Sequence, residues 1–335
     1  MKDINGLVNS LNGYLQWNKA RVECFTLMLL GLFAVKVVNL QEIALAFQSG
    51  AKISSRYRRL QRFFAYFEID YIKIARWIFK LFLKDNEKVY VIIDRTNWFF
   101  GKKKINIFML AVAYEGLAIP LFWRLLDKGG NSNIQEQKGL INQFLDTFGS
   151  KSIAGLLADR EFASGKFFKW LNKNKIPFFI RIKEGSMTYI RDKKFLTAKK
   201  LFKHLNLKEQ TSFGMSVKLF GEKVFLGASR SERGELMIIA TNQLPKNAVP
   251  TYLRRWEVEC LFQSLKGRGF RFEETHLTDL EKIKKLMAVL AIGFAWSHKI
   301  GEWLAAKKPI FLKDHINQKR PQYTYFRYVW ILLGI

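Results

Sequence analysis

The sequence predicts an α/β protein in which a helical N-terminal module precedes a domain built around a β-sheet. From Leu7 to about Phe82 the apolar residues recur at helical spacing. After residue 87, short apolar runs alternate with helical stretches, which is typical of strands joined by helices. The 335 residues are enough for about two domains, and the 49% of hydrophobic residues supply the side chains of a folded core.

Residues 1–86 form the predicted helical N-terminal domain. Its longest uncharged run, Cys24 to Val35, has 12 residues. Because roughly 20 are needed to cross a membrane, we expect a buried helix there. Ser54 and Ser55 are expected to cap a later helix. That helix carries four arginines within seven positions, which suits either a phosphate-binding face or a solvated one: Arg56, Arg58, Arg59 and Arg62.

The predicted core domain spans residues 87–185 and 236–306. Three strands, expected to be antiparallel neighbours, precede a helix, a strand, a second helix and a further strand. This order of elements is that of a ribonuclease-H-like domain. The seven segments are 89–93, 105–114, 117–123, 133–148, 153–158, 165–172 and 176–182.

Residues 186–235 have the pattern of short strands and turns, and we expect them to form a β-rich insertion into the core. The core is then predicted to resume with a strand at 236–240, a helix from Pro250 to about Lys266, and a helix at about 280–306. Residues 307–335 form a basic and aromatic C-terminal segment.

The charge balance indicates a polyanionic partner. Lysine and arginine number 56 against 28 acidic residues, which gives a formal net charge of +28. Such a surface attracts DNA, RNA or anionic membranes. The two cysteines and four scattered histidines provide neither a disulfide framework nor a structural zinc site. We therefore expect a protein of the reducing cytoplasm with no membrane attachment.

Two aspartates stand at the ends of predicted strands: Asp94 follows Val89–Ile93, and Asp159 follows Ile153–Ala158. Strand ends are where α/β folds place their chemistry. If the two strands are neighbours, both carboxylates project from one edge of the sheet, at a separation that a divalent cation can bridge. Oxygen ligands of this kind suit Mg²⁺ or Mn²⁺. A single aspartate at such a place is more often a turn or cap residue, so the pair is the informative feature.

A third acid lies on the helix that Pro250 is expected to begin and Gly267 to end. Four of its residues, at offsets 0, 3, 7 and 14, fall within ~60° of arc at ~100° per residue. They are Tyr252, Arg255, Glu259 and Lys266. An acid between two cations and a phenol suits a surface that grips phosphates and presents a carboxylate to a metal. A solvated face with glutamate–arginine pairs is the alternative.

The Tyr-x₂-Arg-x₃-Glu-x₆-Lys pattern resembles that of the bacterial cut-and-paste DDE transposases of insertion-sequence family four. The sequences around the two aspartates, Ile-Asp-Arg-Thr-Asn-Trp and Ala-Asp-Arg-Glu-Phe, resemble the same family. The resemblance covers most of the chain, including the helical module, the ribonuclease-H-like core and the insertion between the second aspartate and the glutamate. Tyr323–Tyr328 is similar to a basic-aromatic ending in that family.

The resemblance implies a DNA transposase in which Asp94, Asp159 and Glu259 are catalytic and hold two Mg²⁺ ions, for which Mn²⁺ can substitute. Tyr252, Arg255 and Lys266 would position the DNA end, and the four arginines of residues 1–86 would help to bind the terminal inverted repeats. Hydrolytic nicking would be followed by attack of the 3′-hydroxyl ends on target DNA. The implied partner is double-stranded DNA, bound by a homodimer on paired ends in the bacterial nucleoid.

Relatives that release their ends through a DNA hairpin often stack a flipped base on a tryptophan of the insertion. Here no tryptophan lies between Trp170 and Trp256.

Two other functions stay open. A ribonuclease-H-like nuclease or resolvase would share the acids and metals but would not join ends, and it does not need the full four-residue stripe. A non-catalytic DNA-binding protein descended from a transposase would be expected to have lost one acid.

Overall fold

Helices form the N-terminal part of the chain, as the helical spacing predicts. The structure, a computed structural model, describes residues 2–47, 49–84, 86–190, 194–315 and 318–332. Trp77, on the fifth helix, donates a hydrogen bond to Ser10 Oγ on the first helix at 2.9 Å, and this bond joins the two helices. No helix in the described ranges is long and apolar enough to cross a membrane. The N-terminal helices are α1 (Lys2–Leu15), α2 (Lys19–Val35), α3 (Leu40–Leu45), α4 (Ile53–Tyr66) and α5 (Tyr71–Phe82).

The capping prediction for α4 is wrong. The helix begins at Ile53, Lys52 occupies the N-cap without a side-chain cap bond, and Ser54 and Ser55 lie inside the first turn. Arg56 holds this end of the helix instead, because its guanidinium donates to the carbonyl oxygens of the preceding segment: those of Phe47, Ser49 and Ala51. These bonds tie the segment before α4 to the helix, whereas the N-cap residue offers no side-chain acceptor to the N–H groups of the first turn.

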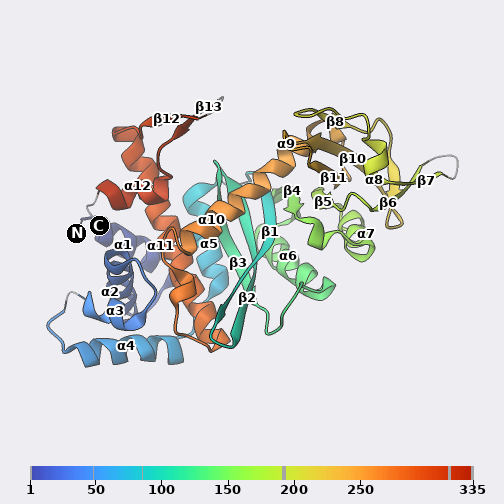
Figure 1. The fold of residues 1–335 in the computed structure, drawn as a ribbon. Coiled ribbons are helices and arrows are strands. Elements are labelled where there is room, and N and C mark those ends of the chain that lie inside the picture. The colour runs from blue at the N-terminus through green and yellow to red at the C-terminus, as the bar shows by residue number, and fades with distance from the viewer. Residues whose placement is uncertain (1, 48, 85, 191–193, 316–317, 333–335) are drawn as a thin grey trace.

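A mixed sheet forms the centre of the molecule, consistent with the expected ribonuclease-H-like core (Figure 1). Its strand order is β3-β2-β1-β4-β5-β11-β10-β9-β6-β7, and β8 also pairs with β10. The first three strands are antiparallel neighbours, as predicted, whereas β1, β4 and β5 are parallel. These strands are β1 (Val89–Phe100), β2 (Lys103–Tyr114), β3 (Leu117–Leu125), β4 (Ile153–Ala158), β5 (Phe178–Ile182) and β11 (Leu236–Thr241).

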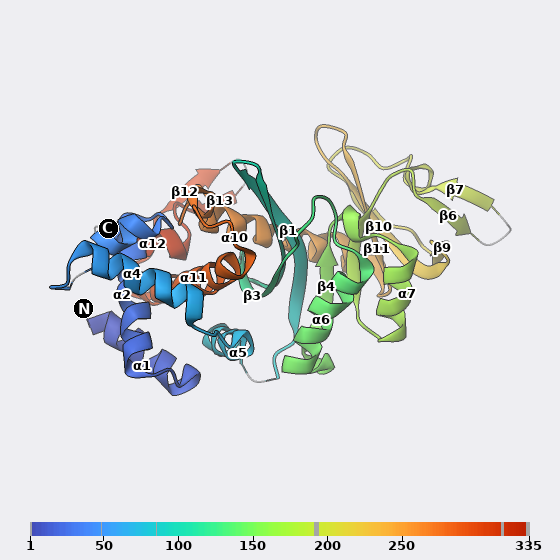
Figure 2. The same cartoon turned by 90° about the horizontal axis from the view of Figure 1, so that it is seen from below.

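The strands between β5 and β11 lie within residues 186–235 and project from one end of the sheet (Figures 1 and 2). Because β10 pairs with β11, this β-rich segment continues the central sheet. The short helix α8 (Ala198–Leu201) belongs to the same segment. Its strands are β6 (Met187–Ile190), β7 (Lys194–Thr197), β8 (Gln210–Ser212), β9 (Val217–Leu219) and β10 (Glu222–Arg230).

Helices cover both faces of the sheet, which explains why residues 105–113 of β2 are all buried. On one face lie α6 (Ile134–Phe148) and α7 (Gly165–Lys173), and on the other lie α9 (Ala248–Leu253), α10 (Glu257–Leu265) and α11 (Leu280–Lys307) (Figures 1 and 2). The chain ends with a hairpin and a helix packed on α11: β12 (Leu312–His315), β13 (Gln318–Pro321) and α12 (Tyr325–Leu332).

The expected single helix from Pro250 to Gly267 is interrupted. It consists of α9, a 3-10 turn at Arg254–Trp256, and α10. The backbone stays in the right-handed helical region through the turn, with φ near −60°. A 3-10 turn is tighter than an α-helix, so the angular offsets of an ideal helix do not hold across it. Arg255, in the middle of the turn, contacts acidic side chains of two elements, Asp94 of β1 and Glu259 of α10.

The helix α11 joins the N-terminal helices to the sheet. Its 28 residues pack against α2, α4 and α5 as well as against β3. Lys285 on α11 donates to the carbonyl oxygen of Phe64 at 2.9 Å, and Gly293 lies against Leu29. The N-terminal helices and the sheet therefore share one helix as part of both cores.

We predict that Gly301→Ala destabilises the protein. A Cβ at this position of α11 would lie 2.1 Å from the backbone oxygen of Tyr325, where α12 crosses α11. Overpacking of this kind costs about 1–3 kcal/mol, so the free energy of unfolding and the melting temperature should fall. Gly13→Ala is the matched control, because a Cβ on this helical glycine meets nothing within 4 Å. Equal melting curves for the two variants would contradict the predicted close packing.

Candidate active site

Asp94 lies within β1, and its side chain is only 16% exposed. Its Oδ1 accepts a hydrogen bond from the backbone N–H of Arg95 at 2.7 Å. Burial raises the pKa of the Asp94 carboxyl to about 6, although Arg255 lowers it. A carboxylate in this position needs a cation beside it, because burial disfavours its charged form.

Asp159 is the first residue after β4, and its Oδ1 accepts a hydrogen bond from the Arg160 N–H at 2.7 Å. The ladder between β1 and β4 ends with the pair Ile93–Ala158. The next residue on each strand is therefore an aspartate. The two carboxyl groups therefore lie at the same level on adjacent parallel segments. The prediction that Asp94 ends its strand is wrong, because pairing with β2 continues β1 to Phe100.

Glu259, on α10, is linked to Asp94 through the side chain of Arg255. The Arg255 guanidinium donates to Asp94 Oδ2 at 2.8 Å and to Glu259 Oε1 at 2.6 Å. The side chain of Arg255 is 7% exposed, whereas that of Glu259 is 43% exposed. Burial opposes the charge on Arg255, but Tyr252 and Asp94 together raise its pKa. One buried cation thus lies between two of the three acids.

Tyr252 connects the third acid to this group. The ring is fully buried, its hydroxyl lies 3.5 Å from Asp159 Oδ1, and burial raises the pKa of the phenol. Asp94, Asp159 and Glu259 therefore converge, although 65 and 100 residues separate them along the chain (159 − 94; 259 − 159).

Lys266, which follows α10, points back to β1. Its Nζ donates to the carbonyl oxygen of Asn97 at 3.3 Å and lies 4.9 Å from the centre of the Trp98 ring. Burial lowers the pKa of this lysine. The stripe of four residues thus faces β1 and the end of β4, and each member contacts a group of the protein.

The oxygen donors of the three acids suit a hard divalent cation. Within the described ranges, however, no group of three or more His, Cys, Asp or Glu side chains is arranged to hold a metal. The guanidinium of Arg255 bonds both Asp94 and Glu259 in this structure. The three acids thus fit a divalent cation in the chemistry of their donor atoms.

The four arginines of α4 divide into two pairs. Arg56 bonds backbone carbonyls, and Arg59 bonds Glu23 and the carbonyl oxygen of Ala20 on α2. Arg58 and Arg62 are exposed. The prediction that all four bind DNA therefore fits Arg58 and Arg62 better than Arg56 and Arg59, whose guanidinium groups bind the segment before α4 and the helix α2, respectively.

Two residues beside the acids, Arg95 and Glu161, were not predicted from the sequence. They form a bidentate ion pair, with Arg95 Nε and Nη2 donating to the two carboxylate oxygens at 2.7 and 2.6 Å. The signal in the sequence is that both residues lie in the motifs around the two aspartates, Ile-Asp-Arg-Thr-Asn-Trp and Ala-Asp-Arg-Glu-Phe. Nothing in the sequence shows that Arg95 and Glu161 meet.

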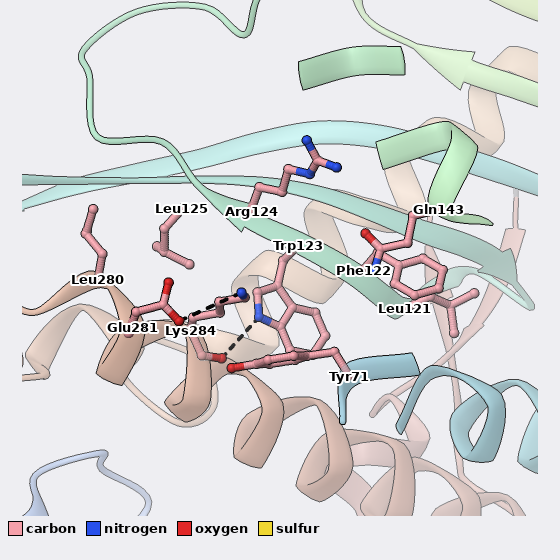
Figure 3. A pocket seen from close by; sticks show the side chains of 10 residues that line it. All are labelled: Tyr71, Leu121, Phe122, Trp123, Arg124, Leu125, Gln143, Leu280, Glu281 and Lys284. Atoms are coloured by element: carbon pink, nitrogen blue, oxygen red, sulfur yellow. Dashed lines mark hydrogen bonds and ion pairs between the residues drawn. The ribbon is translucent and has the colours of Figure 1, made fainter. Parts of the chain in front are cut away.

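A pocket of about 400 Å³ lies at the edge strand β3 (Figure 3). Trp123 Nε1 donates to the carbonyl oxygen of Lys284 at 3.1 Å, and the Lys284 ammonium pairs with Glu281. None of the predicted site residues lines this pocket, so it is separate from the convergent acids. Its lining comprises Tyr71, Leu121, Phe122, Trp123, Arg124, Leu125, Gln143, Leu280, Glu281 and Lys284.

Comparison with protein families matches residues 85–294, more than half of the chain, to the family described as Transposase DDE domain. The matched segment contains Asp94, Asp159 and Glu259. It begins just before β1 and ends within α11. No curated protein matches the chain.

We predict strong coupling between Asp94 and Arg255. Arg255→Met leaves a buried carboxylate without its cation, which typically costs about 3–5 kcal/mol. In Asp94→Asn/Arg255→Met the loss should be smaller than the sum of the two single losses, by roughly 1–3 kcal/mol. Urea denaturation of the wild type and the three variants measures this difference.

The pair Lys208–Glu232 is the control, because its side chains are 67% and 71% exposed. Exposed pairs contribute about 0–1 kcal/mol, so the same cycle there should give little coupling. Additive losses at Asp94 and Arg255 would mean that the arginine does not stabilise this carboxylate.

Proposed function

The chain belongs to the transposase DDE domain family, and from this we propose that it is a DNA transposase that cuts at transposon ends and joins the 3′-hydroxyl ends to target DNA. We further propose that it belongs to the insertion-sequence family four group, on the spacing of Tyr252, Arg255, Glu259 and Lys266. The observation that carries the proposal is the convergence of Asp94, Asp159 and Glu259 around Arg255 and Tyr252.

The three carboxylates would hold two Mg²⁺ ions, and Mn²⁺ would substitute. When bound, such ions activate an attacking water or 3′-hydroxyl and stabilise the leaving oxygen of an in-line displacement. Asp94 and Asp159 present oxygen atoms from adjacent strands, and Glu259 adds the third carboxylate from the exposed side. Tyr252 orients Asp159 through its hydroxyl.

Arg255 and Lys266, the two cations of the stripe, would also bind DNA phosphates. On cation binding, Arg255 releases Asp94 and becomes available to a DNA phosphate, to which a guanidinium binds in bidentate geometry. Lys266 is held by one carbonyl oxygen and the Trp98 ring. A phosphate is a stronger partner for its ammonium than a neutral carbonyl, so DNA would draw Lys266 away from β1.

Residues 1–86 would bind the terminal inverted repeats. Support comes from the exposed Arg58 and Arg62 on α4, the outermost helix at the lower edge of Figure 1. A homodimer would hold two such ends, and bound DNA would place the protein on the bacterial nucleoid. A nuclease or resolvase with the same acids would cleave but not join ends, so strand transfer with the DNA that flanks the encoding gene separates the two functions.

We predict that Glu259→Gln separates binding from chemistry. Glutamine keeps the shape and hydrogen bonding of the side chain but removes a charge that holds metal. Binding of a labelled transposon end should persist while cleavage in Mg²⁺ falls by several powers of ten. Asp94→Asn should behave in the same way. Lys266→Ala should weaken DNA binding and leave cleavage that lower salt partly restores. Near wild-type cleavage by Glu259→Gln would refute the assignment of the acids.

We also predict that Arg58 and Arg62 set part of the salt dependence of DNA binding. Each neutralised phosphate contributes about 0.9 to the slope of log affinity against log salt. Arg58→Ala/Arg62→Ala should therefore flatten the slope by up to about 2 and leave the melting temperature unchanged. Arg56→Ala is the comparison, and it should lower the melting temperature because three backbone carbonyls lose their donor. An unchanged slope in the double variant would place end binding elsewhere.

A further inference from the structure

The backbone ladder does not hold Asp159 beside Asp94. The last residue pair between β1 and β4 is Ile93–Ala158. Beyond that pair, β1 continues to Phe100, but the other chain segment leaves the sheet and enters a 3-10 turn at Arg160–Phe162. Asp159 therefore lies one residue past the end of the ladder. The buried Phe162 ring, which stacks on Phe108 of β2, anchors the turn to the sheet. A second side-chain interaction joins the turn to β1.

Arg95 and Glu161 provide this interaction. Arg95 follows Asp94 on β1, and Glu161 lies two residues after Asp159. The guanidinium donates from Nε and Nη2 to the two carboxylate oxygens at 2.7 and 2.6 Å. The side chains are 11% and 23% exposed, so water screens the pair only weakly. This fork-to-fork geometry fixes orientation as well as distance.

The guanidinium of Arg95 is itself held in place. Its Nη1 donates to the carbonyl oxygen of Gly130, and its Nη2 donates to Asn131 Oδ1 at 2.8 Å. Asn106 on β2 binds the same segment through the carbonyl oxygens of Lys128 and Gly130. Arg95 is thus fixed between the loop after β3 and the turn after β4, which distinguishes it from a mobile surface arginine.

Successive side chains of a strand point to opposite faces. Asp94 faces α10 and meets Arg255, whereas Arg95 faces the side of α6 and meets Glu161. The pair therefore acts on the backbone that carries the two aspartates, from the face opposite the acids.

We propose that Arg95 and Glu161 are positioning residues that set the separation of the Asp94 and Asp159 carboxylates and thereby the affinity of the site for divalent cations. The inference rests on the proposed function, since it takes these carboxylates as the cation ligands. Groups that orient metal ligands from behind typically change metal affinity about 10–100-fold when they are altered. The same range is expected here.

The test uses Arg95→Lys and Glu161→Gln in the full chain. Lysine keeps the charge but cannot make the two parallel bonds, and glutamine keeps the shape but removes the charge. Mn²⁺ binding is measured by calorimetry without DNA, and the Mg²⁺ concentration for half-maximal cleavage is measured with it. Both variants should need at least about 10-fold more cation, with DNA affinity unchanged and cleavage largely restored at saturating Mg²⁺.

Arg230→Gln is the matched control, because Arg230 is a part-buried arginine of the β-rich segment that bonds the carbonyl oxygens of Leu205 and Gly234. It should lose melting temperature without a change in cation affinity. If Arg95→Lys and Glu161→Gln also lose only melting temperature, the pair is merely structural and the proposal is overturned. If Arg95→Lys does not fold, Glu161→Gln alone decides. A wild-type protein that binds no Mn²⁺ and does not cleave would overturn the proposed function, and the positioning role with it.

Discussion

The burial of a carboxylate in the central sheet is the constraint on which the site depends. Asp94 lies in a strand whose neighbours are covered on both faces, and burial raises its pKa to about 6. An isolated charge there is costly, so a cation has to accompany it. Arg255 supplies that charge from the 3-10 turn between the helices that carry Tyr252 and Glu259. One electrostatic requirement thus organises residues from three elements.

The positive charge of the protein is not all available to a ligand. Arg56, Arg59, Arg95 and Arg255 each bind carbonyl or carboxylate oxygens of the protein itself, and Lys266 lies against β1. An arginine in a basic sequence motif can therefore be a structural donor instead of a contact for a phosphate. The exposed cations, such as Arg58 and Arg62, remain to attract a polyanion over long distances.

The strands were predictable because their apolar runs are short and bounded by turns, and the antiparallel order of the first three followed from them. The parallel pairing of β1, β4 and β5 comes from the structure. The full length of β1 was not predictable from the sequence, because residues 95–97 are charged or polar and belong to the strand through their pairing with β2. The turn at Arg254–Trp256 was not predictable either, because the apolar and polar pattern there continues as in an α-helix, and the contact of Arg255 with Asp94 joins positions 161 residues apart. Arg95 and Glu161 are separated by 66 positions, and no local pattern shows that they pair.

The sharing of α11 between the N-terminal helices and the sheet has a mechanical consequence. A 28-residue α-helix is ~42 Å long at 1.5 Å per residue, which corresponds to about 12 base pairs at 3.4 Å each. Such a rigid rod, packed into both cores, prevents the two parts from swinging independently. If α4 reads a DNA sequence, the cut would fall at a fixed number of base pairs from it. The rigid connection through α11 would then fix the number of base pairs between the recognised sequence and the cut. An insertion of half a helical turn between these two positions would turn the scissile phosphate to the wrong side of the duplex.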